Sequence, residues 1–323
     1  EDYGTLYIQW ADSIHRAVPN IKLGGPSFQE IEPDSREGKA ELGNPVWLER
    51  FIHYLDKHDR ASDFSFFSFE WYPFDEVCKP TPPQIAQTAK LLSSAIRAFR
   101  RHGLKPDVPL VISEYGYSAF ATRAEIDIEG AIFNADTVGA FLALGGSQAY
   151  LYGYEVNNIE HSYPCTAGNN MLFLGDEKGN IEYRTATYFG TRLMMQEWLQ
   201  PTGGDHKFYL GTVTTKKDRR NTPIAAYTVL RPDGQSSMMI VNRDSMNAWK
   251  VNIRSRNETG QIEDFFKGEV DAYQFSNKEF KWDERLGRPG KSGPPAHTRI
   301  NADRANDFQL PAYSVTVLRG RTK

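Results

Sequence analysis

The chain has 323 residues, 40% of them hydrophobic and 13% aromatic, which is enough for about two domains with apolar cores. Its net charge of -3 argues against a nucleic-acid partner, because phosphate binding requires a basic surface. No apolar run is long enough to span a membrane, so we expect no membrane insertion.

The chain begins with a predicted amphipathic helix over residues 2–18. Its apolar residues recur at helical spacing: Tyr3, Leu6, Trp10, Ile14 and Ala17. So wide an apolar face requires a surface to pack on. Because the sequence starts with Glu1 rather than Met and enters this helix almost at once, we expect further sequence upstream of residue 1.

Short apolar strands then alternate with helices up to residue 200. We expect strands at 21–27, 63–72, 108–113 and 148–155, and helices from Asn44–Pro45, from Pro83 to Gly103, and over 128–144 and 185–199. This alternation predicts a parallel sheet with right-handed crossovers. A complete (β/α)8 barrel takes about 250 residues, so residues 1–200 are predicted to be the C-terminal half of a TIM barrel.

A change of pattern at Pro201–Gly204 marks a predicted domain boundary. Short strands are expected beyond it, at 207–214, 224–230, 237–242, 249–253 and 313–318. Residues 284–302 are rich in Gly, Pro and charge and are predicted to form an irregular loop. We therefore predict an all-β accessory domain over 205–323, a β-sandwich.

The only cysteines are Cys78 and Cys165, each in a predicted loop after a strand. They are expected to pair if the protein is secreted. Two cysteines give no framework pattern, so two free thiols are an equal alternative.

Acidic and aromatic residues follow three of the predicted strands, in the segments 69–74, 113–117 and 152–158. Catalytic residues of such barrels lie at these strand ends, and a carboxylate there is costly to bury unless it is paired or used. The sequence lacks metal-ligand spacing, a phosphate-binding loop and a G-x-S-x-G turn, so we expect neither metal nor cofactor. Carboxylates with aromatics suit glycoside hydrolysis, which requires one carboxylic acid and one carboxylate.

Residues 1–200 resemble the C-terminal half of a clan A retaining glycoside hydrolase, closest to family 39. The resemblance rests on Gly24-Gly25-Pro26 and on Ser113-Glu114-Tyr115, each at a predicted strand end. It implies that the four strands are the fifth to eighth of the barrel, that Glu114 is the nucleophile, and that Tyr72 hydrogen-bonds Glu114. The C-terminal strands are similar to the accessory sandwiches of that group.

The sequence departs from this family at two places. The Asn-Glu-Pro motif that supplies the acid/base is absent, so the resemblance places that glutamate upstream and implies that this chain is inactive alone. Glu70 stands where the group often has a histidine, and a like charge beside Glu114 raises one pKa of the pair. Because retaining chemistry needs carboxyls about 5 Å apart across the sugar, we expect Glu70 to bind substrate hydroxyls rather than replace the acid/base.

Further residues are predicted to bind the sugar. They are Glu70, Trp71, Tyr117, Glu155 and Asn157, with Trp71 as a stacking surface. Five of the candidates also have an ordinary alternative: Glu114 as a helix cap or arginine partner, Tyr72 as a core aromatic, Trp71 as a ring buried under the neighbouring loop, and Glu155 and Asn157 as solvated loop residues.

The sequence thus predicts a secreted or periplasmic glycosidase that cleaves O-glycosidic bonds of a poly- or oligosaccharide by double displacement. The alternative from another class is a non-catalytic carbohydrate-binding or structural module. A lyase or transglycosidase on the same scaffold is a further alternative. The sugar, endo or exo action and the oligomeric state stay open.

Overall fold

The computed structural model describes residues 2–323 except 30–44, 160–164, 166, 167, 169, 170, 202, 215–221, 257, 258, 305 and 306. Its internal contacts divide the chain into two compact units. Unit 1 comprises Glu1–Pro73, Ala89–Tyr115 and Leu144–Tyr152, and unit 2 comprises Phe74–Thr88, Gly116–Ala143 and Gly153–Lys323. The chain passes between the units several times. The boundary predicted at 200–205 marks the change from helices to strands along the sequence, and it does not coincide with the division into these two units. As a domain boundary it stays a prediction.

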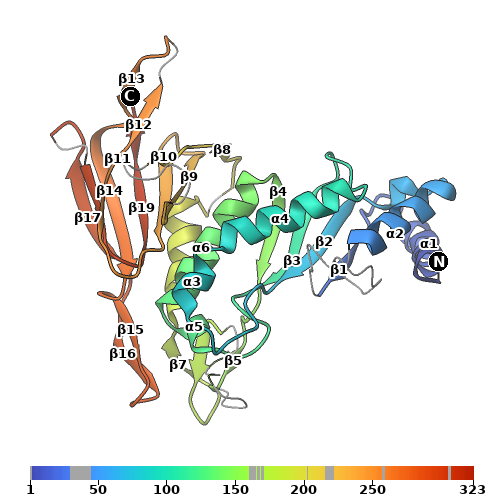
Figure 1. Ribbon diagram of the computed structural model, residues 1–323, viewed down its shortest axis with the longest axis horizontal. Helices are drawn as coiled ribbons and strands as arrows, with labels where there is room; N and C mark the ends of the chain where they lie inside the picture. Colours follow the sequence, from blue (N-terminus) through green and yellow to red (C-terminus); the bar gives the residue numbers. More distant parts are fainter. Residues whose placement is uncertain are drawn as a thin grey trace. The chain divides into compact units, whose positions relative to one another are not determined.

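Unit 1 is built on a four-stranded parallel sheet (Figure 1). Its strands, in spatial as well as chain order, are β1 (Gly24–Phe28), β2 (Phe66–Trp71), β3 (Leu110–Tyr115) and β4 (Gly146–Leu151). The parallel arrangement predicted from the alternation is therefore confirmed. The fourth strand ends at Leu151, four residues short of its predicted end.

Unit 1 also contains α1 (Asp2–Ala17), α2 (Pro45–Lys57) and most of α4 (Thr88–Arg101). The helix predicted over 2–18 is confirmed, whereas the predicted cap Asn44 lies outside the described residues. The helix predicted from Pro83 is split into α3 (Thr81–Ile85) and α4. Gly103 follows α4 with a φ of +93°, a left-handed conformation that glycine adopts without strain.

The core of unit 1 is aromatic. Phe67 and Phe69 of β2 are fully buried, and their rings lie 4.7 and 6.0 Å from the ring of Phe99 in α4. Phe28 of β1 joins the same cluster at 5.9 Å from Phe99. Because side chains alternate along a strand, these residues leave the opposite face of β2 to Ser68 and Glu70.

Unit 2 contains α3, α5 (Arg123–Ile126), α6 (Ile128–Ala143) and α7 (Ala186–Leu193), which continues as a π-helical turn over Met194–Trp198. A small sheet joins β5 (Val156–Asn157), β6 (Phe173–Gly175) and β7 (Ile181–Arg184). Cys78 and Cys165 form a disulfide with a Cα–Cα distance of 5.2 Å, which settles the alternative left open by the sequence.

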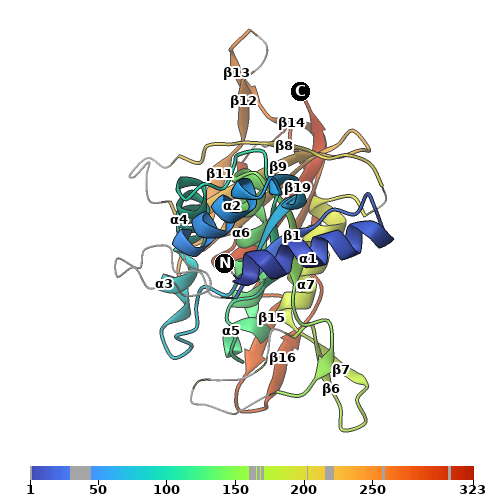
Figure 2. The same cartoon turned by 90° about the vertical axis from the view of Figure 1, so that its right-hand side faces the viewer.

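The largest sheet of unit 2 has six antiparallel strands in the order β17-β14-β19-β10-β9-β8. These strands are β8 (Lys207–Tyr209), β9 (Ile224–Leu230), β10 (Ser236–Asn242), β14 (Phe266–Ser276), β17 (Ala296–Asn301) and β19 (Ser314–Thr322). Three strand pairs adjoin it: β11 (Trp249–Asn252) with β18 (Asp307–Leu310), β12 (Arg254–Arg256) with β13 (Ile262–Asp264), and β15 (Phe280–Asp283) with β16 (Arg288–Ser292). Figure 2 shows the hairpins β12–β13 and β15–β16 at opposite ends of unit 2.

The irregular loop predicted over 284–302 is wrong, because this stretch contains β16 and β17. Among the strands that the structure describes, β17 pairs only with β14, at the edge of the six-stranded sheet, and most of its side chains are exposed. An exposed edge strand needs no apolar alternation, and charged residues there oppose pairing with other chains. The glycines and prolines that suggested a loop lie in and around β16, between Gly287 and Pro295, and β17 itself contains neither.

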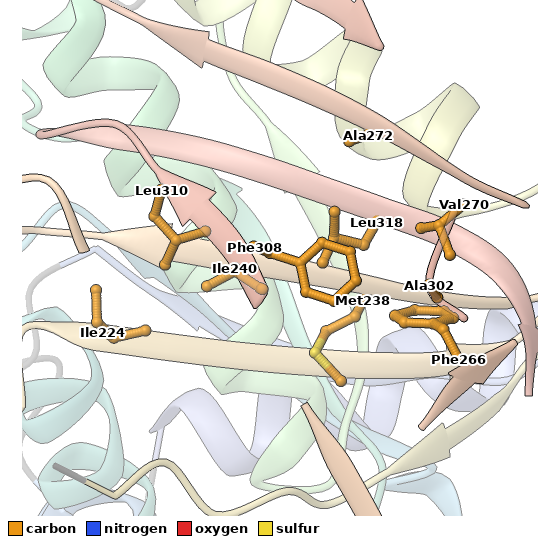
Figure 3. Packing of buried hydrophobic residues seen from close by; sticks show 10 residues of the cluster. All are labelled: Ile224, Met238, Ile240, Phe266, Val270, Ala272, Ala302, Phe308, Leu310 and Leu318. Atoms are coloured by element: carbon orange, nitrogen blue, oxygen red, sulfur yellow. The ribbon is translucent and has the colours of Figure 1, made fainter. Parts of the chain in front are cut away.

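The six-stranded sheet is covered on both faces. Phe308 and Leu310 of β18 pack over Ile240 and Leu318 in the apolar cluster that Figure 3 shows. The other face meets α6, where a Cβ atom on Gly139 would overlap the ring of Tyr227. The sheet is therefore part of one core with α6.

Candidate active site

A bulge in β3 sets the direction of Glu114. Phe69 of β2 is paired with Ile112 of β3, yet the next residue of β2, Glu70, is paired with Glu114. Ser113 is thus an extra residue in β3. If β3 were regular, with Ser113 paired in the ladder, strict alternation would place Glu114 on the same face as Ile112, against the aromatic core. The bulge brings Glu114 to the opposite face, beside Glu70.

Tyr72 follows β2 directly and contacts the same carboxylate. Its hydroxyl donates a hydrogen bond of 3.1 Å to Oε2 of Glu114. Burial and, as the second largest cause, the negative charge of Glu114 raise the pKa of Tyr72 far above its ordinary value, so the hydroxyl keeps its proton. The hydrogen bond expected from the sequence is present, and it leaves Oε1 of Glu114 for other contacts.

Glu70 differs from an ordinary surface glutamate. Burial raises its pKa, and the neighbouring charge of Glu114 raises it further. Its register partner on the adjacent parallel strand is Glu114, and such strands lie about 4.8 Å apart. The site therefore combines a carboxylate held by a phenol with a second carboxyl that retains its proton to higher pH.

Two residues expected to bind sugar are buried instead. Trp71 is 4% exposed and lies on the core side of β2, where its ring is 6.4 Å from Phe69. Tyr117 is 2% exposed in unit 2, with its ring 5.1 Å from Phe74 and 5.7 Å from Phe133. The structure thus contradicts both assignments, because neither ring has a free face to stack on a sugar.

Glu155 and Asn157 are exposed residues of unit 2. Asn157 lies in β5, and Glu155 directly precedes this strand. The amide oxygen of Asn157 accepts a hydrogen bond of 2.9 Å from the backbone N–H of Asn158. Their role as sugar contacts stays a prediction, whereas Glu70, Tyr72 and Glu114 are gathered by one sheet in unit 1.

Sequence reasoning gave no role to two tyrosines of unit 1, although one of them, Tyr152, lies in the strand-end segment 152–158. Tyr150 and Tyr152 are 55% and 46% exposed. Gln148, two residues before Tyr150, is paired with Val111 of β3. Alternation along β4 places all three side chains on the face that carries Glu114. The spacing of two in Gln148-Ala-Tyr-Leu-Tyr152 is the signal that identifies them.

Among the described residues, no group of three or more His, Cys, Asp or Glu side chains has an arrangement suited to a metal ion. Within the same part of the chain, no helix is long and apolar enough to cross a membrane.

Comparison with known proteins gives matches to solved structures only. No family model and no curated protein matches the sequence. The family 44 endoglucanase Cel44A from Clostridium thermocellum matches 98% of this chain at 15% identity and a TM-score of 0.58. An α-L-arabinofuranosidase from Thermotoga maritima matches 98% at 14% identity and a TM-score of 0.60. The fold is similar to that of known glycoside hydrolases.

A bifunctional glucanase-xylanase from a metagenome library, CelM2, matches 99% of this chain at 13% identity and a TM-score of 0.56. The chain spans only 59–61% of the length of these three structures. At such low identity the likeness concerns the fold.

Proposed function

We propose that this chain carries the nucleophile part of a retaining glycoside hydrolase site. The observation that carries the proposal is the arrangement at the ends of β2 and β3, where Tyr72 donates to Glu114 and Glu70 lies beside it. The fold likeness to an endoglucanase, a glucanase-xylanase and an arabinofuranosidase supports a carbohydrate substrate.

In the proposed reaction, Oε1 of Glu114 attacks the anomeric carbon and a glycosyl ester forms as the glycosidic C–O bond breaks. The leaving oxygen takes a proton from a carboxylic acid that lies outside this chain. That group, now a carboxylate, removes a proton from water, which attacks the anomeric carbon and releases Glu114. Tyr72 holds Oε2 throughout, so the attacking oxygen stays oriented.

We further propose that β1 to β4 are the fifth to eighth strands of a clan A (β/α)8 barrel, and that residues 205–323 are its accessory β-domain. The sequence resemblance is to family 39, whereas the endoglucanase named above belongs to family 44. Location outside the cytoplasm is part of the proposal, since disulfides such as Cys78–Cys165 persist in oxidising compartments.

The test is Glu114→Gln in the full-length protein that contains this chain. We expect turnover to fall at least about 1,000-fold and labelling by a 2-fluoro glycoside to disappear. Glu177→Gln is the matched control, because Glu177 is an exposed turn residue. Retained labelling of the Glu114 variant would refute the assignment. Binding of oligosaccharides without turnover by the unmodified protein would favour a non-catalytic module.

A further inference from the structure

The edge strand β1 carries a second bulge at the same level of the sheet. Pro26 is paired with Ser68 of β2, but the next pair joins Phe28 to Phe69, so Ser27 is an extra residue. Ser27 has a φ of +61°, in the left-handed region that non-glycine residues rarely adopt. Such outliers persist only where the surroundings hold them.

The two extra serines contact each other. Ser27 Oγ and Ser113 Oγ lie 2.6 Å apart, and either hydroxyl can donate the hydrogen bond. Their strands are not neighbours, because β2 lies between β1 and β3. The bond therefore passes across β2 at the level of Phe69, on the face that the Phe69 ring leaves free.

We infer that the Ser27–Ser113 hydrogen bond is a positioning device that fixes the bulge of β3 and thereby the place of the Glu114 carboxylate. The inference rests on the proposed function and deepens it. Ser113 precedes Glu114 directly, so any displacement of the Ser113 backbone moves Glu114 with respect to Tyr72. A displacement of about 1 Å between reacting groups lowers turnover by about 100-fold.

Loss of the bridge is not expected to unfold the strand. A slip of one residue would turn Glu114 toward the side of Phe69 and Trp71, where an ionised carboxylate is costly to bury. The apolar face thus maintains the register on its own, and the serines set the finer position within it. This separation makes the proposal testable with folded variants.

The variants are Ser113→Ala, Ser27→Ala and Ser27→Gly in the full-length protein. We expect kcat to fall about 10- to 100-fold with KM changed less than about threefold. Ser27→Gly removes the hydroxyl and also relieves the left-handed backbone, so it should lose turnover without a lower melting temperature. Ser113→Thr keeps a hydroxyl and should restore most of the turnover. Ser13→Ala is the control, because its exposed hydroxyl bonds to Gln9 and Arg16 within α1, away from the sheet.

The double variant Ser27→Ala/Ser113→Ala should be no slower than either single variant, because both remove one bond. A crystal structure of Ser113→Ala is expected to show Glu114 displaced from Tyr72. Unchanged kcat together with an unmoved Glu114 would overturn the inference. If Glu114 is displaced in Ser113→Ala but turnover is unchanged, and if Glu114→Gln keeps full activity, the proposed function is rejected. The positioning of Glu114 by the serines would still stand.

Discussion

Removal of the Cys78–Cys165 disulfide offers a direct measure of what holds the protein together. The cysteines are 87 residues apart in the sequence, and both are exposed. A cross-link that closes a loop of this length restricts the unfolded chain by about 4.5 kcal/mol on the chain-entropy model. Native domains are stable by about 5–15 kcal/mol, so this contribution is a large share.

Because both side chains are exposed, the loss of the cross-link can be measured without a change in core packing. Truncating them in Cys78→Ala/Cys165→Ala leaves no cavity in a core, so the change in the free energy of unfolding reports the cross-link. With a slope of about 3 kcal/mol per molar urea for a chain of this size, the midpoint should fall by about 1.5 M. Tryptophan fluorescence and circular dichroism, followed together, measure it.

The wild-type protein with its disulfide reduced is the control, and it should unfold at the same urea concentration as the double variant. An unchanged midpoint in the variant would refute the reasoning, since it would mean that the unfolded chain is already restricted without the bond.

Three further changes test the site and the core. Tyr72→Phe removes the donor to Glu114 and should lower kcat/KM about 10- to 100-fold, corresponding to about 1.5–3 kcal/mol, in steady-state assays of the full-length protein. Glu70 binds its proton more tightly in the folded than in the unfolded state, so stability falls as pH rises above its ordinary pKa. Glu129, whose burial raises its pKa to about 7, adds a fall of its own, so Glu70→Gln should make the slope shallower in urea titrations between pH 4 and 8, and an unchanged slope would contradict the cause. Tyr227 donates a hydrogen bond of 2.7 Å to the fully buried Asp136, so Tyr227→Phe should cost about 1–3 kcal/mol of unfolding free energy, and a loss below about 0.5 kcal/mol would disprove this.

The parallel sheet of unit 1 was predictable because its strands are apolar runs between helices. The same reasoning identified Glu114 as an acid at a strand end, whereas Tyr72 was named as its hydrogen-bond partner only through the family resemblance. Trp71 was misassigned because its side of the strand depends on which neighbour covers each face. The alternation with Phe69, once the covered face is known, places its ring in the core.

The two bulges could not be predicted. Ser27 and Ser113 are ordinary residues in their sequence context, and only the pairing of each strand with β2 identifies them as extra. The edge strand β17 was missed for a related reason. Its side chains face solvent, so the hydrophobic signal on which a strand prediction rests is absent.

The close approach of Gly139 to Tyr227 has a consequence for engineering. Because the Tyr227 ring fits against α6 only where Gly139 has no side chain, the antiparallel sheet is not an exchangeable module. The indole N–H of Trp198 also donates to the backbone of Tyr227 at 3.0 Å, which ties the end of the preceding helical segment to the same strand. A chimera joined at residue 200 would separate surfaces shaped for each other, so viable hybrids should exchange α6 and α7 together with the sheet.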